Sequence, residues 1–223
     1  MYNANQILLK QYMTGNEFDK ILLELDGVFN SGDKMFGPEW EGVRKQQIGF
    51  LLERPLMLKV LSEKVWGPSR IHVYWTEEWK ETERAISELT KSQGAEELAD
   101  MTILSLTLDS LNQQLILPPQ IRLLESASGQ IANGLHKRLG LDMTSLIPVA
   151  EKKIKLNEIR NPPEAFVLVS HEGMEQSKQR LDHNWSVLKQ ARNSMPKLLN
   201  NPGWWKKQLF VDESGWMREI DTT

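Results

Sequence analysis

The stretch EEWKETERAISELTKSQGAEELAD, residues 77–100, contains two acidic pairs with the same internal spacing. Glu78 and Glu81 are three residues apart, and so are Glu97 and Asp100, with fifteen residues between the pairs. Because residues i and i+3 lie on one face of a helix, each pair places two carboxylates side by side. The two pairs predict either two solvated helix faces or four ligands of a metal ion.

The composition is that of an ordinary globular protein. The chain has 223 residues, of which 40% are hydrophobic and 26% charged, so a substantial core can be buried. A net charge of -3 and a pI near 5.9 leave no excess of basic residues of the kind that nucleic-acid-binding domains carry. The absence of cysteine excludes disulfides, thiolate zinc sites and cysteine nucleophiles. We therefore expect no nucleic-acid partner.

The N-terminal segment MYNANQILLKQYM does not have the pattern of a signal peptide, because no basic segment precedes an apolar run. No apolar run approaches the roughly 18 residues that a membrane span needs. These two features predict a soluble, cytoplasmic protein without a membrane partner.

Helical periodicity dominates the chain and predicts an all-α fold. One helical region should bend or break near Pro55, and residues 67–75 read as a connector. Thr76 is a favourable N-cap for the helix that carries the first acidic pair, and Gly94 should separate that helix from the next. The predicted helical segments cover residues 4–30, 41–66, 76–92, 95–115, 119–139, 140–160 and 174–195.

The second half of the chain differs in composition from the first. Four of the eight tryptophans lie beyond position 160. We place a domain boundary near residue 161, between a helical domain (1–160) with an N-terminal helical extension and a Trp-rich extension (161–223). Short strands are predicted at 166–169 and 208–212. The Trp-rich tail NPGWWKKQLFVDESGW reads best as a small satellite core; a lid, an interface element and a binding module are the alternatives.

The two acidic pairs pose a geometric problem. If the first helix begins at Thr76, then Glu81 and Glu97 both lie near helix starts, which antiparallel packing does not bring together. The pairs can meet if the first helix is long or its register displaced. Four carboxylates in one small volume would repel one another, and Mg²⁺ would resolve this repulsion with oxygen ligands. Two ions are also compatible, as in two-metal phosphoryl transfer.

A polar stripe follows on a later predicted helix. Lys153, Asn157 and Arg160 are spaced i, i+4 and i+7, so they lie along one face. The ammonium of a lysine, the amide of an asparagine and the guanidinium of an arginine can together bind a polyphosphate. The alternative interpretation of this stripe is a solvated face of an amphipathic helix. Trp75, close to the first acidic pair, suits stacking on a nucleobase, although packing at a helix start is the commoner role of such an aromatic residue.

The order of these motifs resembles that of the MazG-like all-α nucleoside triphosphate pyrophosphohydrolases. The motif EExxE covers Glu77 to Glu81, EELAD covers Glu96 to Asp100, and an apolar helix and KxxxNxxR follow. The resemblance covers roughly residues 70–160. It implies a four-helix-bundle core and a homodimer or homotetramer. The chain departs from the minimal family in three places. About 70 residues precede the motifs, the connection containing LILPPQ is lengthened, and a C-terminal extension follows.

The resemblance also implies functional roles. Glu78, Glu81, Glu97 and Asp100 match Mg²⁺ ligands, with Mn²⁺ as a second option, and one of these carboxylates would take the proton of the attacking water. In the same way, Lys153, Asn157 and Arg160 match residues that hold phosphates.

The expected reaction is Mg²⁺-dependent hydrolysis of a nucleoside triphosphate (NTP or dNTP) to the monophosphate and pyrophosphate, as nucleotide-pool housekeeping. One alternative is a non-catalytic binding or regulatory protein on the same helical scaffold. The other is a hydrolase of a related phosphoribosyl nucleotide.

Overall fold

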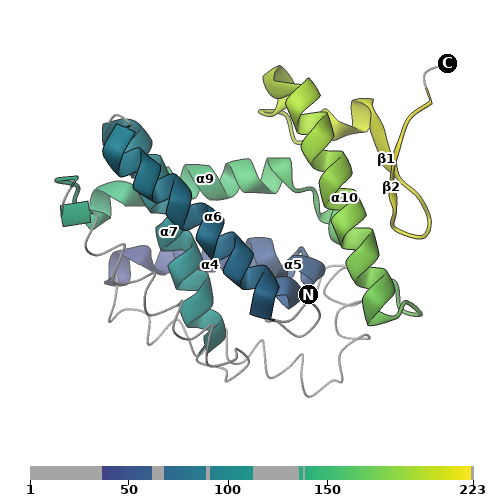
Figure 1. Ribbon diagram of the computed structural model, residues 1–223, viewed down its shortest axis with the longest axis horizontal. Helices are drawn as coiled ribbons and strands as arrows, with labels where there is room; N and C mark the ends of the chain where they lie inside the picture. The colour runs from purple at the N-terminus through teal and green to yellow at the C-terminus, as the bar shows by residue number, and fades with distance from the viewer. Residues whose placement is uncertain (1–36, 62–67, 89–90, 113–135, 138, 222–223) are drawn as a thin grey trace. The chain divides into compact units, whose positions relative to one another are not determined.

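The protein is predominantly helical, which confirms the all-α prediction (Figure 1). The computed structural model describes residues 37–61, 68–88, 91–112, 136–137 and 139–221. The α-helices of this part are α4 (Glu41–Leu52), α5 (Pro55–Leu61), α6 (Pro68–Glu88), α7 (Lys91–Asn112), α9 (Ile147–Arg160) and α10 (Met174–Ser194). The 3₁₀ helices are η1 (Pro38–Trp40), η2 (Met143–Leu146), η3 (Pro163–Phe166), η4 (Pro196–Leu198) and η5 (Trp204–Lys207), and strands β1 (Leu209–Val211) and β2 (Met217–Glu219) form an antiparallel hairpin.

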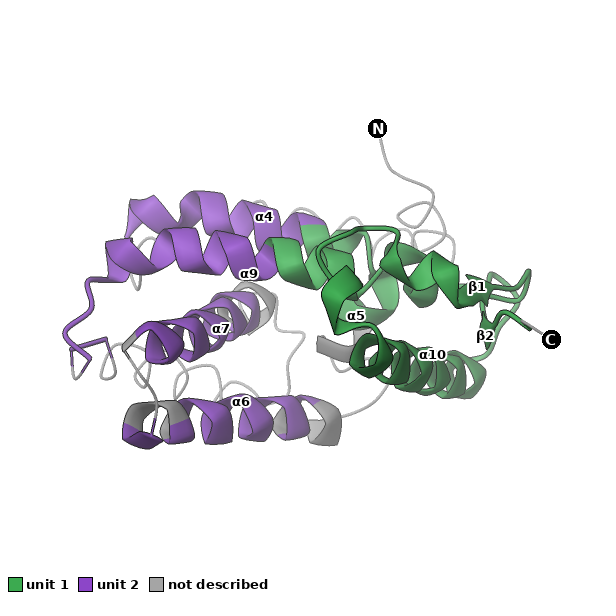
Figure 2. Cartoon of the chain, turned by 90° about the horizontal axis from the view of Figure 1, so that it is seen from above, with its two compact units in different colours: residues 1–18, 50–58, 155–223 green, residues 19–49, 59–154 purple. Residues whose placement is uncertain are grey.

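The described residues fall into two compact units, coloured separately in Figure 2. Unit 1 contains residues 50–58 and 155–221, and unit 2 contains the other described residues between 37 and 154. The division falls within α9, after Ile154. The domain boundary near residue 161 stays a prediction.

Unit 2 contains the hairpin of α6 and α7, which pack against each other. The second of these helices is buried nearly all round, since every residue from 98 to 108 except Asp100 and Leu104 is buried. Its threonines satisfy their hydroxyls locally: Thr102 donates to the carbonyl of Leu98 at 2.7 Å, and Thr107 to that of Ile103 at 2.9 Å. This local bonding lets polar side chains lie in an apolar environment.

Two helix boundaries in unit 2 were predicted wrongly. Residues 68–75 are not a connector but the first two turns of α6, so Thr76 lies inside the helix and is not its N-cap. Pro68 occupies the first helical position, where its missing N–H costs no hydrogen bond. Gly94 likewise lies in the first turn of α7, which begins at Lys91. A single glycine lowers helix stability by only about 1 kcal/mol, and the burial of Gly94 shows that packing covers it.

Other predicted segments match the structure or lie outside it. The break near Pro55 is confirmed, because α4 ends at Leu52 and α5 begins at Pro55. The helices predicted for residues 140–160 and 174–195 correspond to η2 with α9 and to α10. Those predicted for 4–30 and for most of 119–139 lie outside the described residues.

Unit 1 is organised around α10. Arg180 lies on this helix, is fully buried, and donates from Nε and Nη2 to the carboxylate of Glu172. Its Nη1 donates to the carbonyl of Val167. One turn later, the buried Asn184 donates to the carbonyls of Ala165 and Gly215, both at 2.8 Å. These two side chains therefore tie the segment before α10 to the helix itself.

The strand predicted at 166–169 is wrong, whereas the strand predicted at 208–212 is confirmed as β1. The carbonyl of Val167 is taken by Arg180, and that of Val169 by the main-chain N–H of Glu172. Hydrogen-bonding groups needed for a ladder are thus used elsewhere. Trp204 and Trp205 are buried in unit 1, as the satellite-core interpretation predicts.

None of the helices in the described part of the chain has the length and apolar character needed to cross a bilayer.

Candidate active site

The four predicted carboxylates lie on the two helices of the α6–α7 hairpin. Glu81 is seven residues before the end of α6, and Glu97 is six residues after the start of α7. Glu78 and Asp100 are ten and nine residues from the same ends. Because α7 turns back along α6, Glu81 is level with Glu97 and Glu78 with Asp100. The first helix is long, and this length resolves the geometric problem posed by the sequence.

Glu78 is half-buried and shares a face of α6 with Ile71 and Thr82. Both neighbours are buried, at helical spacing from Glu78. The hydroxyl of Thr82 donates to the carbonyl of Glu78 at 2.7 Å. Glu81, one turn later at the solvent-facing edge of this face, is exposed. The two members of one acidic pair therefore have different environments.

One carboxylate oxygen of Glu78 is buried and lacks a partner. Its Oε2 atom accepts no hydrogen bond from any residue that the structure describes. A buried polar atom of this kind costs about 1–3 kcal/mol, and more when the group is charged. The site therefore offers an unsatisfied acceptor oxygen where the carboxylates gather.

The acidic neighbours also perturb the ionisation of Glu78. Burial raises the pKa of Glu78 from its ordinary value of 4.5 to about 8, and the charges of Asp100, Glu81 and Glu97 add to this rise, while Lys153 opposes it. Burial likewise raises the pKa of Glu97; the charges of Asp100 and Glu81 reinforce the shift, whereas Lys153 opposes it. The carboxylates therefore repel one another, as the sequence predicts, and burial contributes more than this repulsion to the raised pKa values.

Lys153 is a cation that contacts this cluster. Its Nζ donates to Oδ2 of Asp100 at 2.6 Å, and the two side chains are only 16% and 21% exposed. Although burial lowers it, the pKa of Lys153 is raised overall, because Asp100, Glu97 and Glu96 all stabilise the ammonium. The sequence singled out Lys153 as a phosphate contact and contained no signal for its pairing with Asp100, 53 positions away.

The donor set fits a hard divalent cation. Carboxylate oxygens are the ligands that Mg²⁺ and Mn²⁺ prefer, and the carboxyl of Glu78, with its unpartnered oxygen, is influenced by the charges of Asp100, Glu81 and Glu97. Within the described residues, no three His, Asp or Glu side chains converge as a preassembled metal group. Glu78, Glu81, Glu97 and Asp100 would hold such an ion after side-chain rotation and release of Asp100 by Lys153.

The remaining predicted residues have separate environments. Asn157 and Arg160 lie one and two turns after Lys153 on α9, in the part of that helix that belongs to unit 1. Arg160 lines a pocket of that unit with residues of α10. Trp75 stacks on Trp79, one turn away on α6, with 6.1 Å between ring centroids and 13° between planes. One face of Trp75 is therefore used in packing.

Comparison with protein-family models, with curated proteins and with solved structures found no match. The functional argument therefore depends on the geometry of the site itself.

Proposed function

We propose that the protein hydrolyses a nucleoside triphosphate to the monophosphate and pyrophosphate with Mg²⁺, or Mn²⁺ in its place. The observation that carries this proposal is the unpartnered buried oxygen of Glu78, on a carboxyl whose pKa the charges of Asp100, Glu81 and Glu97 raise. A structural role alone does not favour four carboxylates in one place, because their repulsion destabilises the fold. A cation-dependent function accounts for their presence.

The chemistry of the site suits attack on a phosphoryl group. A divalent cation supplies neutralisation of the phosphate charge and Lewis-acid polarisation. Glu78, Glu81, Glu97 and Asp100 would bind it from two helices, and one of these carboxylates would accept the proton of the attacking water. Lys153 neutralises Asp100 in the cation-free protein and would turn to the phosphates when Asp100 binds the cation.

The remaining roles follow from the resemblance to MazG-like enzymes and belong to the same proposal. Asn157 and Arg160 would contact phosphates, and Trp75 would contact the base. The four-helix core and the homodimer or homotetramer are also proposed, and light scattering would measure the oligomeric state.

Pyrophosphate release from a panel of canonical and modified NTPs and dNTPs tests the reaction. We expect release with Mg²⁺ and none with EDTA. Glu97→Gln and Asp100→Asn should abolish turnover while the circular dichroism spectrum stays that of a folded helical protein. Glu77→Gln is the matched control, because Glu77 is exposed and lies next to the acidic pair without belonging to it.

The panel also separates the alternatives. Folded protein that turns over no nucleotide in the presence of Mg²⁺ would refute the hydrolase and favour a binding or regulatory role on the same scaffold. Turnover confined to a phosphoribosyl nucleotide would keep the chemistry and change the substrate. Equal loss of activity in Glu77→Gln and Asp100→Asn would show that the overall negative charge of this region, and not these four ligands, supports turnover.

A further inference from the structure

A surface pocket in unit 1 gathers three basic side chains. It has a volume of about 570 Å³ and is lined by Arg160, Lys189, Arg192, Asn193, Pro196 and Leu199. The residues come from the end of α9, the last turns of α10, and η4 with the residue after it. Lys189 and Arg192 lie three residues apart and therefore on one face of α10. The C-terminal part of the chain thus supplies most of the pocket.

These cations have no anionic partner in the described part of the chain. The side chains of Arg160, Lys189 and Arg192 make no ion pair or hydrogen bond with any residue that the structure describes. Burial lowers the pKa of Arg192, and the charge of Arg160 lowers it further. The two guanidinium groups are therefore close enough to repel each other. Such an arrangement stores unfavourable energy that an anion would relieve.

Helix-end electrostatics account for only part of this arrangement. A basic residue in the last turn of a helix is favourable, and Arg160 and Arg192 each occupy such a position. The dipole explains each arginine alone but not why the two converge on one pocket with Lys189. The two helix ends contribute roughly half a negative charge each, which three full positive charges outweigh.

We propose that this pocket binds a phosphorylated small molecule that carries at least two negative charges. Guanidinium groups present several N–H donors in a fixed plane and match the multiple oxygens of a phosphate. The amide of Asn193 adds a further donor, and Pro196 and Leu199 provide apolar contact for the rest of the ligand. The volume lies within the roughly 300–1,000 Å³ of small-molecule sites.

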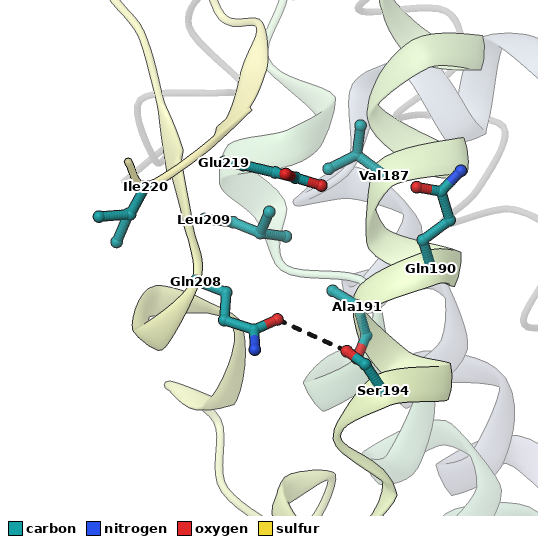
Figure 3. A pocket seen from close by; sticks show the side chains of 8 residues that line it. All are labelled: Val187, Gln190, Ala191, Ser194, Gln208, Leu209, Glu219 and Ile220. Carbon is teal, nitrogen blue, oxygen red and sulfur yellow. Dashed lines mark hydrogen bonds between the residues drawn. The ribbon is translucent and has the colours of Figure 1, made fainter. Parts of the chain in front are cut away.

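A second pocket of unit 1 has a lining without basic residues. Figure 3 shows this pocket, of about 400 Å³, between α10 and the β-hairpin. Glu219 is its one charged lining residue, and Ser194 donates to Gln208 across it at 3.5 Å. This lining indicates no ligand class. Of these two pockets, the α9–α10 pocket is the one that gathers cations.

Titration calorimetry with inorganic pyrophosphate tests the proposal, with the whole chain, at low ionic strength and in EDTA. Without divalent cations the carboxylate cluster of unit 2 repels this anion, so binding reports on the basic pocket. Arg160 also belongs to the proposed hydrolysis, so the test variants are placed at Lys189 and Arg192, which that proposal does not use. We expect one site per chain. Lys189→Gln and Arg192→Gln should each weaken binding by about tenfold, since each removes a charge-assisted contact.

Lys178→Gln is the matched control, because Lys178 lies on the same helix roughly 21 Å from Arg192 and removes the same charge. It should change the affinity by less than about twofold. Absence of pyrophosphate binding would overturn the proposal, as would equal weakening by all three variants. If a single-stranded oligonucleotide binds and pyrophosphate does not, the proposal is overturned in favour of a nucleic-acid-binding surface.

Discussion

Replacing Glu78 by glutamine should remove a large pH-dependent loss of stability. Burial, with the charges of Asp100, Glu81 and Glu97, raises the pKa of this carboxyl from 4.5 to about 8 in the folded protein. Below pH 4.5 the group is protonated in both the folded and the unfolded chain, so it contributes no penalty. Above that pH the unfolded chain ionises first, and folding is disfavoured by about 1.4 kcal/mol for each pH unit up to the folded pKa.

The expected magnitude follows from this interval. Between about pH 5 and about pH 8 the wild-type protein should lose roughly 4 kcal/mol of unfolding free energy through Glu78 alone. That is a large share of the roughly 5–15 kcal/mol typical of a folded domain. The glutamine of Glu78→Gln cannot ionise, so the unfolding free energy of this variant should fall by roughly 4 kcal/mol less than that of the wild type over the same pH interval. The difference between the two pH profiles, and not stability at any one pH, is the quantity to measure.

Urea denaturation in EDTA at several pH values measures this difference. Glu88→Gln is the matched control, because Glu88 ends the same helix and is exposed. Its profile should run parallel to that of the wild type. Parallel profiles for wild type and Glu78→Gln would refute the burial of this carboxyl and remove the main support for the cation site. Mg²⁺ at high pH should stabilise the wild type more than Glu78→Gln.

Three further substitutions test contacts by urea denaturation. Lys153→Met removes the ammonium 2.6 Å from Asp100 and should lower the unfolding free energy in EDTA by about 1–3 kcal/mol. Gly215→Ala places a methyl group at φ 78°, 2.5 Å from a buried guanidinium, and should cost about 1–3 kcal/mol or more. Asn184→Ala removes three buried hydrogen bonds to main-chain groups and should cost about 2–5 kcal/mol.

Each of these has a control on the same element or of the same residue type. Lys152→Met changes an exposed lysine next to Lys153, and Asn193→Ala changes an exposed asparagine of α10. Gly203→Ala is the control for Gly215→Ala, because Gly203 has φ -93° and the atom nearest to the added methyl group lies 3.7 Å away. All three controls should stay within about 0.5 kcal/mol of the wild type. A control as destabilised as its partner would show that the named contact is not the cause.

Local sequence signals predicted the elements of the fold better than their ends. Helical periodicity identified the helices, and Pro55 identified a break between two of them. The predicted start of α6 and the predicted helix break at Gly94 were wrong. Capping and glycine preferences contribute about 1 kcal/mol each, and the packing of a buried helix face contributes more. Propensity therefore indicated which segments are helical, and tertiary contacts set their limits.

The sequence by itself determined which residues share a helix face: the two acidic pairs, the Lys153 stripe and the apolar circumference of α7. Those relations span three or four positions and follow from helix geometry alone. Only the tertiary structure decided that one oxygen of Glu78 is buried while Glu81 is exposed, and that Lys153 pairs with Asp100. Only it brought Arg160 to the basic residues of α10. Burial and long-range pairing depend on which faces of distant segments meet, and no local spacing encodes that choice.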